Sequence, residues 1–564
     1  MINLKDREKI SMFSKFKIIL LSVFLFIMFS CGSDEISEEN SSVGKSSNVA
    51  PGLESNSGSS SGSKENVFRI NFSDPPTFDP HLVTDTTSAS IIVEIFSGLV
   101  TLNKDLDIIP DLAESWEVSD DGTVYTFNLR EDIKFSNGEN VTAQDFKWSI
   151  ERSANPDTGS YNADVYLGDI IGVKEVIDSN GGIQEVEGVK AIDDKTLEIT
   201  IDSPKTYFLA KLTYPTAFVL SQKYLESMGD DWIDSPVGTG PFVLQEYQIG
   251  QILKLKRNDL YWGEKSKVDG VIMNLAGGVS MAMYENDEID ITGVGLADLE
   301  RVKDPNDPLS KDLVDVPPQF TLSYIGFNVN MAPFDDENFR KALSHAVDKE
   351  LIADKIYSGL TKPAYAVIPP GFPGYSPSIS GLEFNPELAK DYLSKSKYSD
   401  PATRPRIIVT IPGTGGSPGM DTEVISDMWR ETLEVEVEIQ QVEWATYLQD
   451  MNRKRLQVWA GSGWQADYPD PQDFIDILFY SGSDVNHGNY KNEKVDDLIL
   501  EARTELDQNR RFLLYNQAEQ IVVDEAPIFP LWFDTDGYAL VKPWVKGYSF
   551  TPIIVPKYKD MYIE

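Results

Sequence analysis

Alternating apolar and polar residues mark several half-buried strands along this chain. Residues 67–72 and 125–130 alternate with a period of two, and a turn at 120–122 precedes the second of these strands. Residues 189–201 predict a hairpin around an Asp-Asp-Lys turn, and residues 242–256 predict another just after a Gly-Pro pair. Hairpins of this kind join antiparallel strands.

Apolar residues repeated every three or four positions mark helices, which become denser after residue 333. A pattern close to a capping box at residues 142–145 opens one helix, and an aspartate at 335 or 336 caps another. Asn385-Pro386 begins a third, with proline at the first helical position, and residues 495–506 and 511–523 form a helical pair. Strands interleaved with helices indicate an α/β architecture.

The beginning of the chain carries the pattern of an export signal. A basic segment precedes an apolar run over residues 18–30, and Cys31 follows where the sequence turns polar. A cysteine at the cut site resembles a bacterial lipobox, although two neighbouring positions depart from its usual residues. We expect residues 1–30 to be removed and Cys31 to be lipidated. Residues 31–66, rich in Ser and Gly, are expected to form a flexible tether.

A transmembrane anchor is the alternative interpretation of the same apolar run. The run is shorter than the ~20 residues that a helix needs to cross a bilayer. It also ends in Ser30-Cys31 and not in a basic stop-transfer cluster. We therefore favour the lipoprotein signal, and in both interpretations the polar tail holds the folded part off the membrane.

Composition limits the classes of function. The 564 residues include one cysteine, so no internal disulfide is possible and stability must come from a large core in two or three domains. The 90 acidic residues exceed the 50 basic ones, which gives a net charge of −40. A field of that sign repels nucleic acid and argues against a polyanionic partner.

Motifs of common enzymes are missing from the part of the sequence expected to fold. The three histidines, His81, His345 and His487, are far apart in sequence, so a zinc site is not expected. The one Gly-x-Ser-x-Gly match, at residues 58–62, lies in the predicted tether. We expect no cofactor, no metal and no enzymatic activity, although acidic residues are so frequent that a hydrolase using paired carboxylates stays an alternative.

Ordered motifs extend over almost the whole predicted mature chain. In chain order they are Asp74-Pro-Pro-Thr-Phe-Asp-Pro-His81, Pro110-Asp-Leu-Ala-Glu-Ser-Trp116, Val141-Thr-Ala-Gln-Asp-Phe146, Gly238-Thr-Gly-Pro-Phe242, Phe339-Arg-Lys-Ala-Leu343 and Gly463-Trp-Gln-Ala-Asp-Tyr-Pro-Asp-Pro471. Each motif alone is weak, but their order and spacing are specific. The chain resembles the peptide-binding class of extracytoplasmic solute-binding proteins, which serve ABC importers.

This resemblance implies an α/β fold with two lobes that close around a ligand at a hinge, plus a third domain typical of the class. One lobe is discontinuous, so the chain is expected to cross between domains four times. The expected domains are lobe I over residues 67–97, 218–320 and 535–564, the extra domain II over residues 98–217, and lobe II over residues 321–534.

The resemblance also implies a ligand site in which a peptide lies as an added extended strand, held by main-chain hydrogen bonds. Asp467 matches the family's carboxylate for the α-ammonium, a charge that needs a partner in a water-poor cleft. The backbone of Gly463 and Gln465 matches the segment that pairs with the peptide, and Trp464 matches the wall of a side-chain pocket. A buried turn capped by Asp467 is the structural alternative.

Further residues match positions that meet the ligand in the family, and simple packing is the alternative for each. They are Tyr161, Trp444, Thr84 and Thr86. The chain departs from the family over residues 457–462, where some members place an arginine. The group that neutralises the C-terminal carboxylate of a peptide is therefore open, with Arg453 and Arg455 as candidates by proximity.

The implied function is that of an exported receptor, in the periplasm or at the cell surface, that binds short peptides by hinge closure. The implied partners are the permease and ATPase subunits of an ABC importer and, through the lipid on Cys31, the membrane. A monomer is expected. Three alternatives stay open: the same fold binding another small solute such as a nickel chelate or a sugar, an exported hydrolase, and a receptor that signals.

Overall fold

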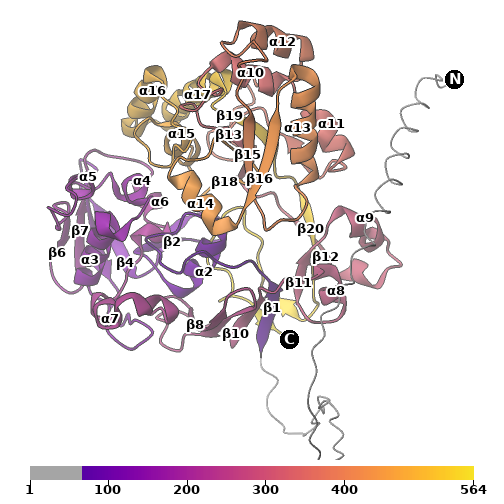
Figure 1. Ribbon diagram of the computed structural model, residues 1–564. Helices are drawn as coiled ribbons and strands as arrows, with labels where there is room; N and C mark the ends of the chain where they lie inside the picture. The colour runs from indigo at the N-terminus through magenta and orange to yellow at the C-terminus, as the bar shows by residue number, and fades with distance from the viewer. Residues whose placement is uncertain (1–65) are drawn as a thin grey trace, which may run out of the picture. The chain divides into compact units, whose positions relative to one another are not determined.

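The computed structural model describes residues 66–564, in which helices and strands interleave (Figure 1). The α/β prediction is therefore confirmed for this range. The predicted signal peptide, Cys31 and the predicted tether up to residue 65 lie outside the described residues. Within residues 66–564, no helix has both the length and the hydropathy that a bilayer crossing needs.

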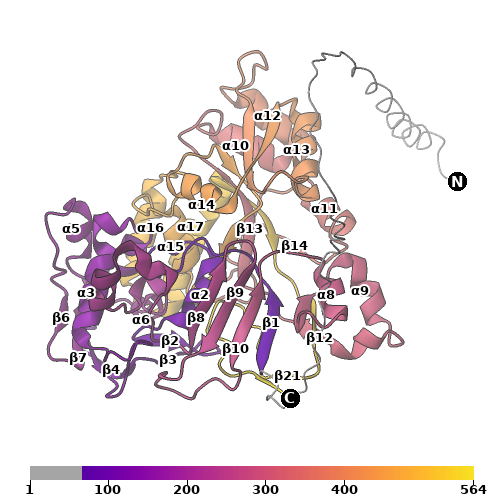
Figure 2. The ribbon, with the colours of Figure 1, turned by 60° about the horizontal axis from the view of Figure 1, so that its bottom comes forward.

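The first sheet combines strands from distant parts of the sequence. β1 (Val67–Asn71) runs parallel to β10 (Gly270–Asn274), which is followed by the antiparallel strands β9 (Ile252–Arg257) and β8 (Phe242–Gln248). The four strands lie side by side in Figure 2. The first predicted strand and the hairpin after the Gly-Pro pair are thus confirmed. Next to this sheet, α2 (Thr86–Ile95) packs against β8.

A second four-stranded sheet is antiparallel throughout and packs against α3 (Ala143–Ala154). Its strands, in spatial order, are β4 (Ala113–Val118), β5 (Val124–Leu129), β7 (Thr196–Thr200) and β6 (Val189–Ala191). The predicted capping box opens α3: the Asp145 N–H donates to Thr142 Oγ1 (3.4 Å), and the Thr142 N–H donates to Asp145 Oδ2 (2.9 Å). The predicted hairpin and this helix start are confirmed.

The largest sheet mixes parallel and antiparallel pairs. Its strands, in spatial order, are β14 (Lys362–Pro363), β19 (Ile528–Phe533), β13 (Thr321–Phe327), β17 (Val458–Trp459), β15 (Ile407–Pro412) and β16 (Val437–Val442), with β18 (Gly463–Gln465) also paired to β13. Its helices include α10 (Glu337–His345), α12 (Pro386–Lys395) and α13 (Met420–Leu433), which pack on one another. Trp429 in α13 donates its indole N–H to the carbonyl of Leu343 in α10 (3.0 Å).

Caps decide where several of these helices begin. Asp336, and not Asp335, caps α10 by accepting the N–H of Phe339 (3.1 Å), while Asp335 pairs with Lys397 (2.7 Å). Asn385 caps α12 as predicted. The predicted helical pair is also confirmed, as α16 (Glu493–Thr504) and α17 (Gln508–Glu525).

Residues near the end of the chain pack into parts formed by much earlier residues. β20 (Gly537–Val541) lies between β11 (Ile291–Gly293) and β12 (Leu313–Val316) and is antiparallel to both. The backbone N–H groups of Lys557 and Tyr558 donate to Glu94 of α2 (2.7 and 3.1 Å). The domain boundaries predicted from the sequence stay a prediction.

The remaining elements are short. The helices are α4 (Ala163–Leu167), α5 (Val173–Asp178), α6 (Phe208–Lys211), α7 (Gln222–Met228), α8 (Ser280–Glu285), α9 (Leu296–Lys303), α11 (Lys349–Lys355), α14 (Trp444–Asn452) and α15 (Gln472–Phe479). Two small pairs of strands complete the structure: β2 (Val100–Leu102) with β3 (Ile108–Pro110), and β21 (Val545–Lys546) with β22 (Tyr562–Ile563).

Candidate functional site

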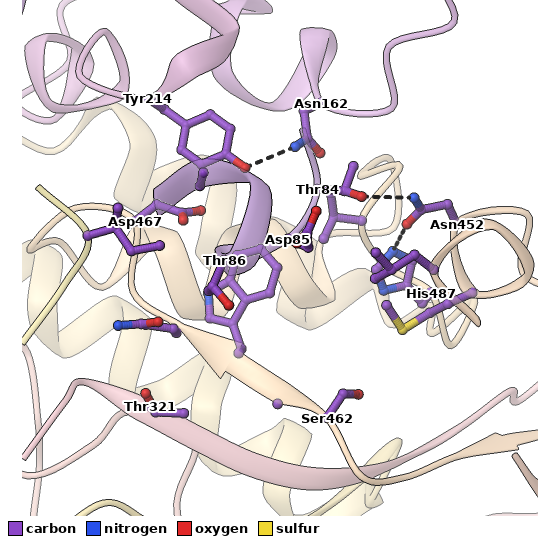
Figure 3. Close-up of a pocket in the computed structure, with 18 of the residues that line it drawn as sticks. Thr84, Asp85, Thr86, Asn162, Tyr214, Thr321, Asn452, Ser462, Asp467 and His487 are labelled. Atoms are coloured by element: carbon purple, nitrogen blue, oxygen red, sulfur yellow. Dashed lines mark hydrogen bonds between the residues drawn. The ribbon is translucent and has the colours of Figure 1, made fainter. Parts of the chain in front are cut away.

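A cavity of about 340 Å³ gathers most of the residues that the sequence singled out (Figure 3). Its walls come from widely separated parts of the chain, namely residues 84–89, Asn162, Tyr214, residues 319–324, residues 444–487 and Ile554. The predicted ligand residues found in its lining are Thr84, Thr86, Trp444, Gly463, Trp464, Gln465 and Asp467. Figure 3 shows Asp467 and His487 on opposite sides of this space.

Tyr161 is the one predicted ligand residue that does not line the cavity. It lies just before α4. Two other tyrosines, Tyr214 and Tyr166, stand at or behind the cavity wall. Tyr214 lines the cavity, and Tyr166 stacks on it with ring centroids 3.9 Å apart. The Tyr166 hydroxyl donates a hydrogen bond to Asp467. Tyr166 is fully buried and resembles an ordinary core residue in sequence, so only the tertiary contact reveals its place in the site.

The edge of β18 supplies unpaired main-chain groups to the cavity. β18 runs antiparallel to β13, with Trp464 opposite Leu322, and the Ala466 N–H donates to the carbonyl of Phe320 (2.9 Å). In an antiparallel pair the residues alternate between facing the partner strand and facing away from it. Since Trp464 and Ala466 face β13, the N–H and C=O groups of Gly463 and Gln465 point to the opposite side. This register leaves them free to bond a further strand.

Asp467 lies two residues after β18, and its side chain is partly buried. Burial raises the pKa of Asp467 to about 7, against the lowering effect of the hydrogen bond from Tyr166. A carboxyl group with that pKa changes its charge near neutral pH. A cation placed in the cavity would favour the ionised form and would gain a strong, water-poor partner.

A second carboxyl group stands behind Asp467. Asp473, in α15, accepts the backbone N–H of Asp467 (3.1 Å) and the indole N–H of Trp464 (3.3 Å). Burial, and then the charge of Asp467, raise the pKa of Asp473 well above its ordinary value. Two neighbouring carboxyl groups resist holding two negative charges, so ionisation of one raises the pKa of the other. Through its two accepted hydrogen bonds, Asp473 fixes the orientation of Trp464 and of the Asp467 backbone.

Uncharged side chains that are hydrogen-bonded to one another line the opposite side of the cavity. Asn452 donates to Thr84 Oγ1 (3.4 Å) and accepts from His487 Nε2 (3.1 Å). Burial, and then the charge of Lys454, lower the pKa of His487 to about 3, so its ring is neutral at pH 7. Arg453 and Arg455, the candidate partners for a peptide carboxylate, are exposed and do not line the cavity.

Comparison with known proteins now identifies the family. The family model of bacterial extracellular solute-binding proteins, family 5, matches residues 107–486. This chain belongs to that family. The dipeptide-binding protein DppE of Bacillus subtilis is 32% identical over 528 residues, covering 91% of this chain and 94% of that protein. The periplasmic oligopeptide-binding protein OppA of Escherichia coli is 31% identical over 531 residues, covering 92% and 96%.

Solved structures agree with this assignment. The crystal structure of Haemophilus influenzae OppA in complex with the peptide RPPGFSPFR matches with a TM-score of 0.79 and 27% identity, covering 89% of this chain and 99% of that chain. The fold of this family 5 protein is therefore that of an OppA-type binding protein. The family resemblance and the fold class predicted from the sequence are confirmed.

Three buried polar atoms in the cavity wall of this family 5 protein lack hydrogen-bond partners within residues 66–564. They are Thr321 Oγ1, Trp444 Nε1 and Gln465 Nε2. Buried polar groups are costly without partners, so a polar ligand that bonds these atoms would stabilise the wall. In the same described range, no group of three or more His, Cys, Asp or Glu side chains is arranged to hold a metal ion.

Proposed function

We propose that this family 5 protein captures short peptides outside the cytoplasm and delivers them to the permease of an ABC importer. The observation that carries the proposal is the free edge of β18 at Gly463 and Gln465, directly beside Asp467. A peptide can bond to that edge as an added strand through main-chain groups alone. Recognition of the backbone tolerates many side chains, because bridging waters can fill the side-chain pockets.

Asp467 binds the α-ammonium group of the peptide in this proposal. The Tyr166 hydroxyl orients the carboxylate, and Asp473 fixes the backbone from which it projects. Thr84 and Thr86 lie across the cavity from β18, in the predicted lobe I, whereas β18 belongs to the predicted lobe II. A ligand that contacts both lobes binds the closed state better than the open state and shifts the population towards it.

Export and anchoring complete the proposal. Residues 1–30 direct secretion, lipid on Cys31 holds the protein at a membrane, and residues 31–66 act as the tether. The protein acts as a monomer, partners the permease and ATPase subunits of the importer, and binds peptide without turnover. Mass spectrometry of the N-terminal peptide should show a chain that begins at a lipid-modified Cys31, while a chain that keeps residues 1–30 and carries no lipid would favour the transmembrane anchor.

Native mass spectrometry of the protein purified without denaturation tests the ligand class. A series of bound masses spaced as short peptides is the expected result. The D467N variant, purified in parallel, should carry less of this material because it lacks the charge that holds the α-ammonium group. A single non-peptide mass in the wild-type protein would overturn the peptide assignment and keep the family.

A further inference from the structure

Asp85 is a second carboxyl group in the cavity, and the proposed binding of a peptide strand does not use it. It caps α2, with Oδ1 accepting the N–H of Ser88 (2.9 Å). Its residue surface is only 9% exposed, and it lines the cavity. Burial raises the pKa of Asp85, against the hydrogen bond from Ser88. Within residues 66–564, no lysine, arginine or histidine forms an ion pair with it.

Asp85 and Asp467 line the same cavity. Tyr214 lines the same cavity, and burial, then the charges of Asp467 and Asp85, raise the pKa of its hydroxyl well above the ordinary value. Figure 3 shows Asp85, Asp467 and Tyr214 around one space, with Asp85 at the start of its helix. The two carboxyl groups come from opposite walls, one at the end of β18 and one at the beginning of α2.

The charge of the cavity wall has one sign. Among the described residues that line it, none is a lysine or an arginine, and His487 is neutral at pH 7. The α-ammonium group of one peptide can neutralise only one of the two carboxylates. A bound peptide with no further cation leaves Asp85 either protonated, as burial favours, or ionised with only its capping hydrogen bond from Ser88, whereas a second cation stabilises the ionised form.

We propose that Asp85 is a second cation-binding group of the cavity, so that the site selects peptides with a lysine or arginine side chain in addition to the α-ammonium group. The inference rests on the proposed function and narrows it to basic peptides. Because the described wall offers no cation to a C-terminal carboxylate, the same site accepts peptides whose C-terminus is amidated. Carboxylate–cation pairs in a water-poor cavity are much stronger than pairs at a surface.

The test uses ligand-free full-length protein and matched peptides. Lysine is placed in turn at each position of trialanine, and each peptide is compared by isothermal titration calorimetry with its norleucine counterpart, which keeps the methylene chain and lacks the ammonium group. At one or more positions the lysine peptide should bind about tenfold or more tightly. The amidated and free-acid forms of that peptide should bind within about threefold of each other, as expected where no cation meets the carboxylate.

The D85N variant isolates the charge of Asp85 from its role as a cap. Asparagine caps helices as well as aspartate does, so α2 should keep its start. D85N should abolish the preference for lysine over norleucine and leave unchanged the loss of affinity on N-acetylation, which reports on Asp467. D348N is the matched control, because Asp348 caps α11 in the same manner, accepting the Leu351 N–H (2.9 Å), and does not line the cavity.

Two results would overturn the inference while peptide binding stands. One is equal affinity for the lysine and norleucine peptides at every position, and the other is a lysine preference that survives D85N. If none of the peptides binds at all, the proposed peptide function fails, and the inference fails with it. A D85S variant, which also retains a capping side chain, repeats the comparison if D85N lowers the thermal stability of the protein.

Discussion

Asp467 is the residue on which the proposed ligand chemistry depends. It lies beside the free edge of β18, and its partly buried carboxyl group has a pKa of about 7, so its charge changes near neutral pH. Tyr166 and Asp473 hold that carboxyl group and its backbone from two sides, so the α-ammonium group of a ligand meets an oriented partner. Because the site is oriented before the ligand arrives, binding loses less conformational entropy.

Removing the charge of Asp467 should weaken the binding of free-amine peptides. In D467N we expect a loss of about 2–4 kcal/mol in binding free energy, because a buried ammonium group then lacks its counter-charge. Calorimetry with one tripeptide in free and N-acetylated forms measures this. The acetylated peptide should bind wild type and D467N about equally weakly. Equal affinity of wild type for both forms of the peptide would contradict the assigned role.

The pKa of Asp467 also predicts how affinity depends on pH. An ammonium ligand binds the ionised form, and the pKa of about 7 in the free protein means that protonation competes with the ligand below pH 7. Affinity should rise by up to about tenfold per pH unit from pH 5 to 7 and then level off, before the α-amine itself deprotonates near pH ~8. Titrations from pH 5 to 9 measure this profile. A flat profile from pH 5 to 7 would show that Asp467 does not bind the amine.

At the scale of secondary-structure elements, the position of β18 against β13 decides whether its edge can receive a peptide. Gly463 sits so close to β13 that a Cβ there would lie 2.4 Å from the carbonyl oxygen of Leu322. Two atoms cannot approach this closely without a steric clash, and the Leu322 carbonyl belongs to the backbone. A larger residue at position 463 must therefore displace β18.

Gly463→Ala should therefore move β18 away from its position against β13 and so disrupt the proposed peptide-binding edge. We expect a loss of stability of about 1–3 kcal/mol and a marked loss of peptide affinity in the protein that still folds. Urea unfolding and calorimetry separate the two effects. Gly416→Ala is a suitable control, because a Cβ at Gly416 meets no atom within 4 Å. Wild-type affinity in Gly463→Ala would show that the edge of β18 is not where the ligand binds.

Glu519 in α17 should make the free energy of unfolding depend on pH without affecting ligand binding, because it does not line the cavity. Its Oε1 accepts the N–H groups of Val367 and Ile368 (2.8 and 2.9 Å), and burial raises its pKa from 4.5 to about 7. The folded state thus binds a proton that the unfolded state releases between these pH values, so stability falls as pH rises through this window. Between pH 5 and 8, E519Q should lose roughly 2–3 kcal/mol less than wild type in urea unfolding. Equal losses in the two proteins would contradict an ionisable Glu519 with a raised pKa.

Local chemistry explains which parts of the fold were predictable from sequence. The start of α3 depends on Thr142 and Asp145 only three positions apart, and the start of α12 depends on Asn385 and the proline after it. The roles of Tyr166 and Asp85 depend on partners hundreds of positions away, so no local pattern reveals them. Asp467 was found through its family motif, whereas nothing in that motif separates Asp473, which orients the site, from any other helical aspartate.

At the scale of the whole molecule, the cavity joins segments of all three predicted domains. Tyr166 reaches Asp467, and Asn452 reaches Thr84, so the walls are already bonded across the predicted lobes. A ligand that adds bonds across these walls stabilises the folded protein by mass action. Its effect grows with the ratio of ligand concentration to Kd.

A bound peptide should therefore raise global stability measurably. At a peptide concentration about 100 times Kd, the unfolding free energy should increase by about 2.7 kcal/mol, and small-angle scattering should show a smaller radius of gyration. D467N at the same peptide concentration should show a much smaller increase. Stabilisation without any change in the radius would argue against lobe closure and in favour of a site that is formed before the ligand arrives.

The place of β20 between β11 and β12 has a consequence for the order in which the molecule can be assembled. A chain delivered with its N-terminus first presents β11 and β12 long before β20, which supplies the hydrogen bonds that both need. Until then their edges are unpaired and open to chance pairing with other chains. In the proposed export, an intermediate with unpaired strand edges is therefore exposed, and the receptor becomes able to bind only after nearly the whole chain has been translocated.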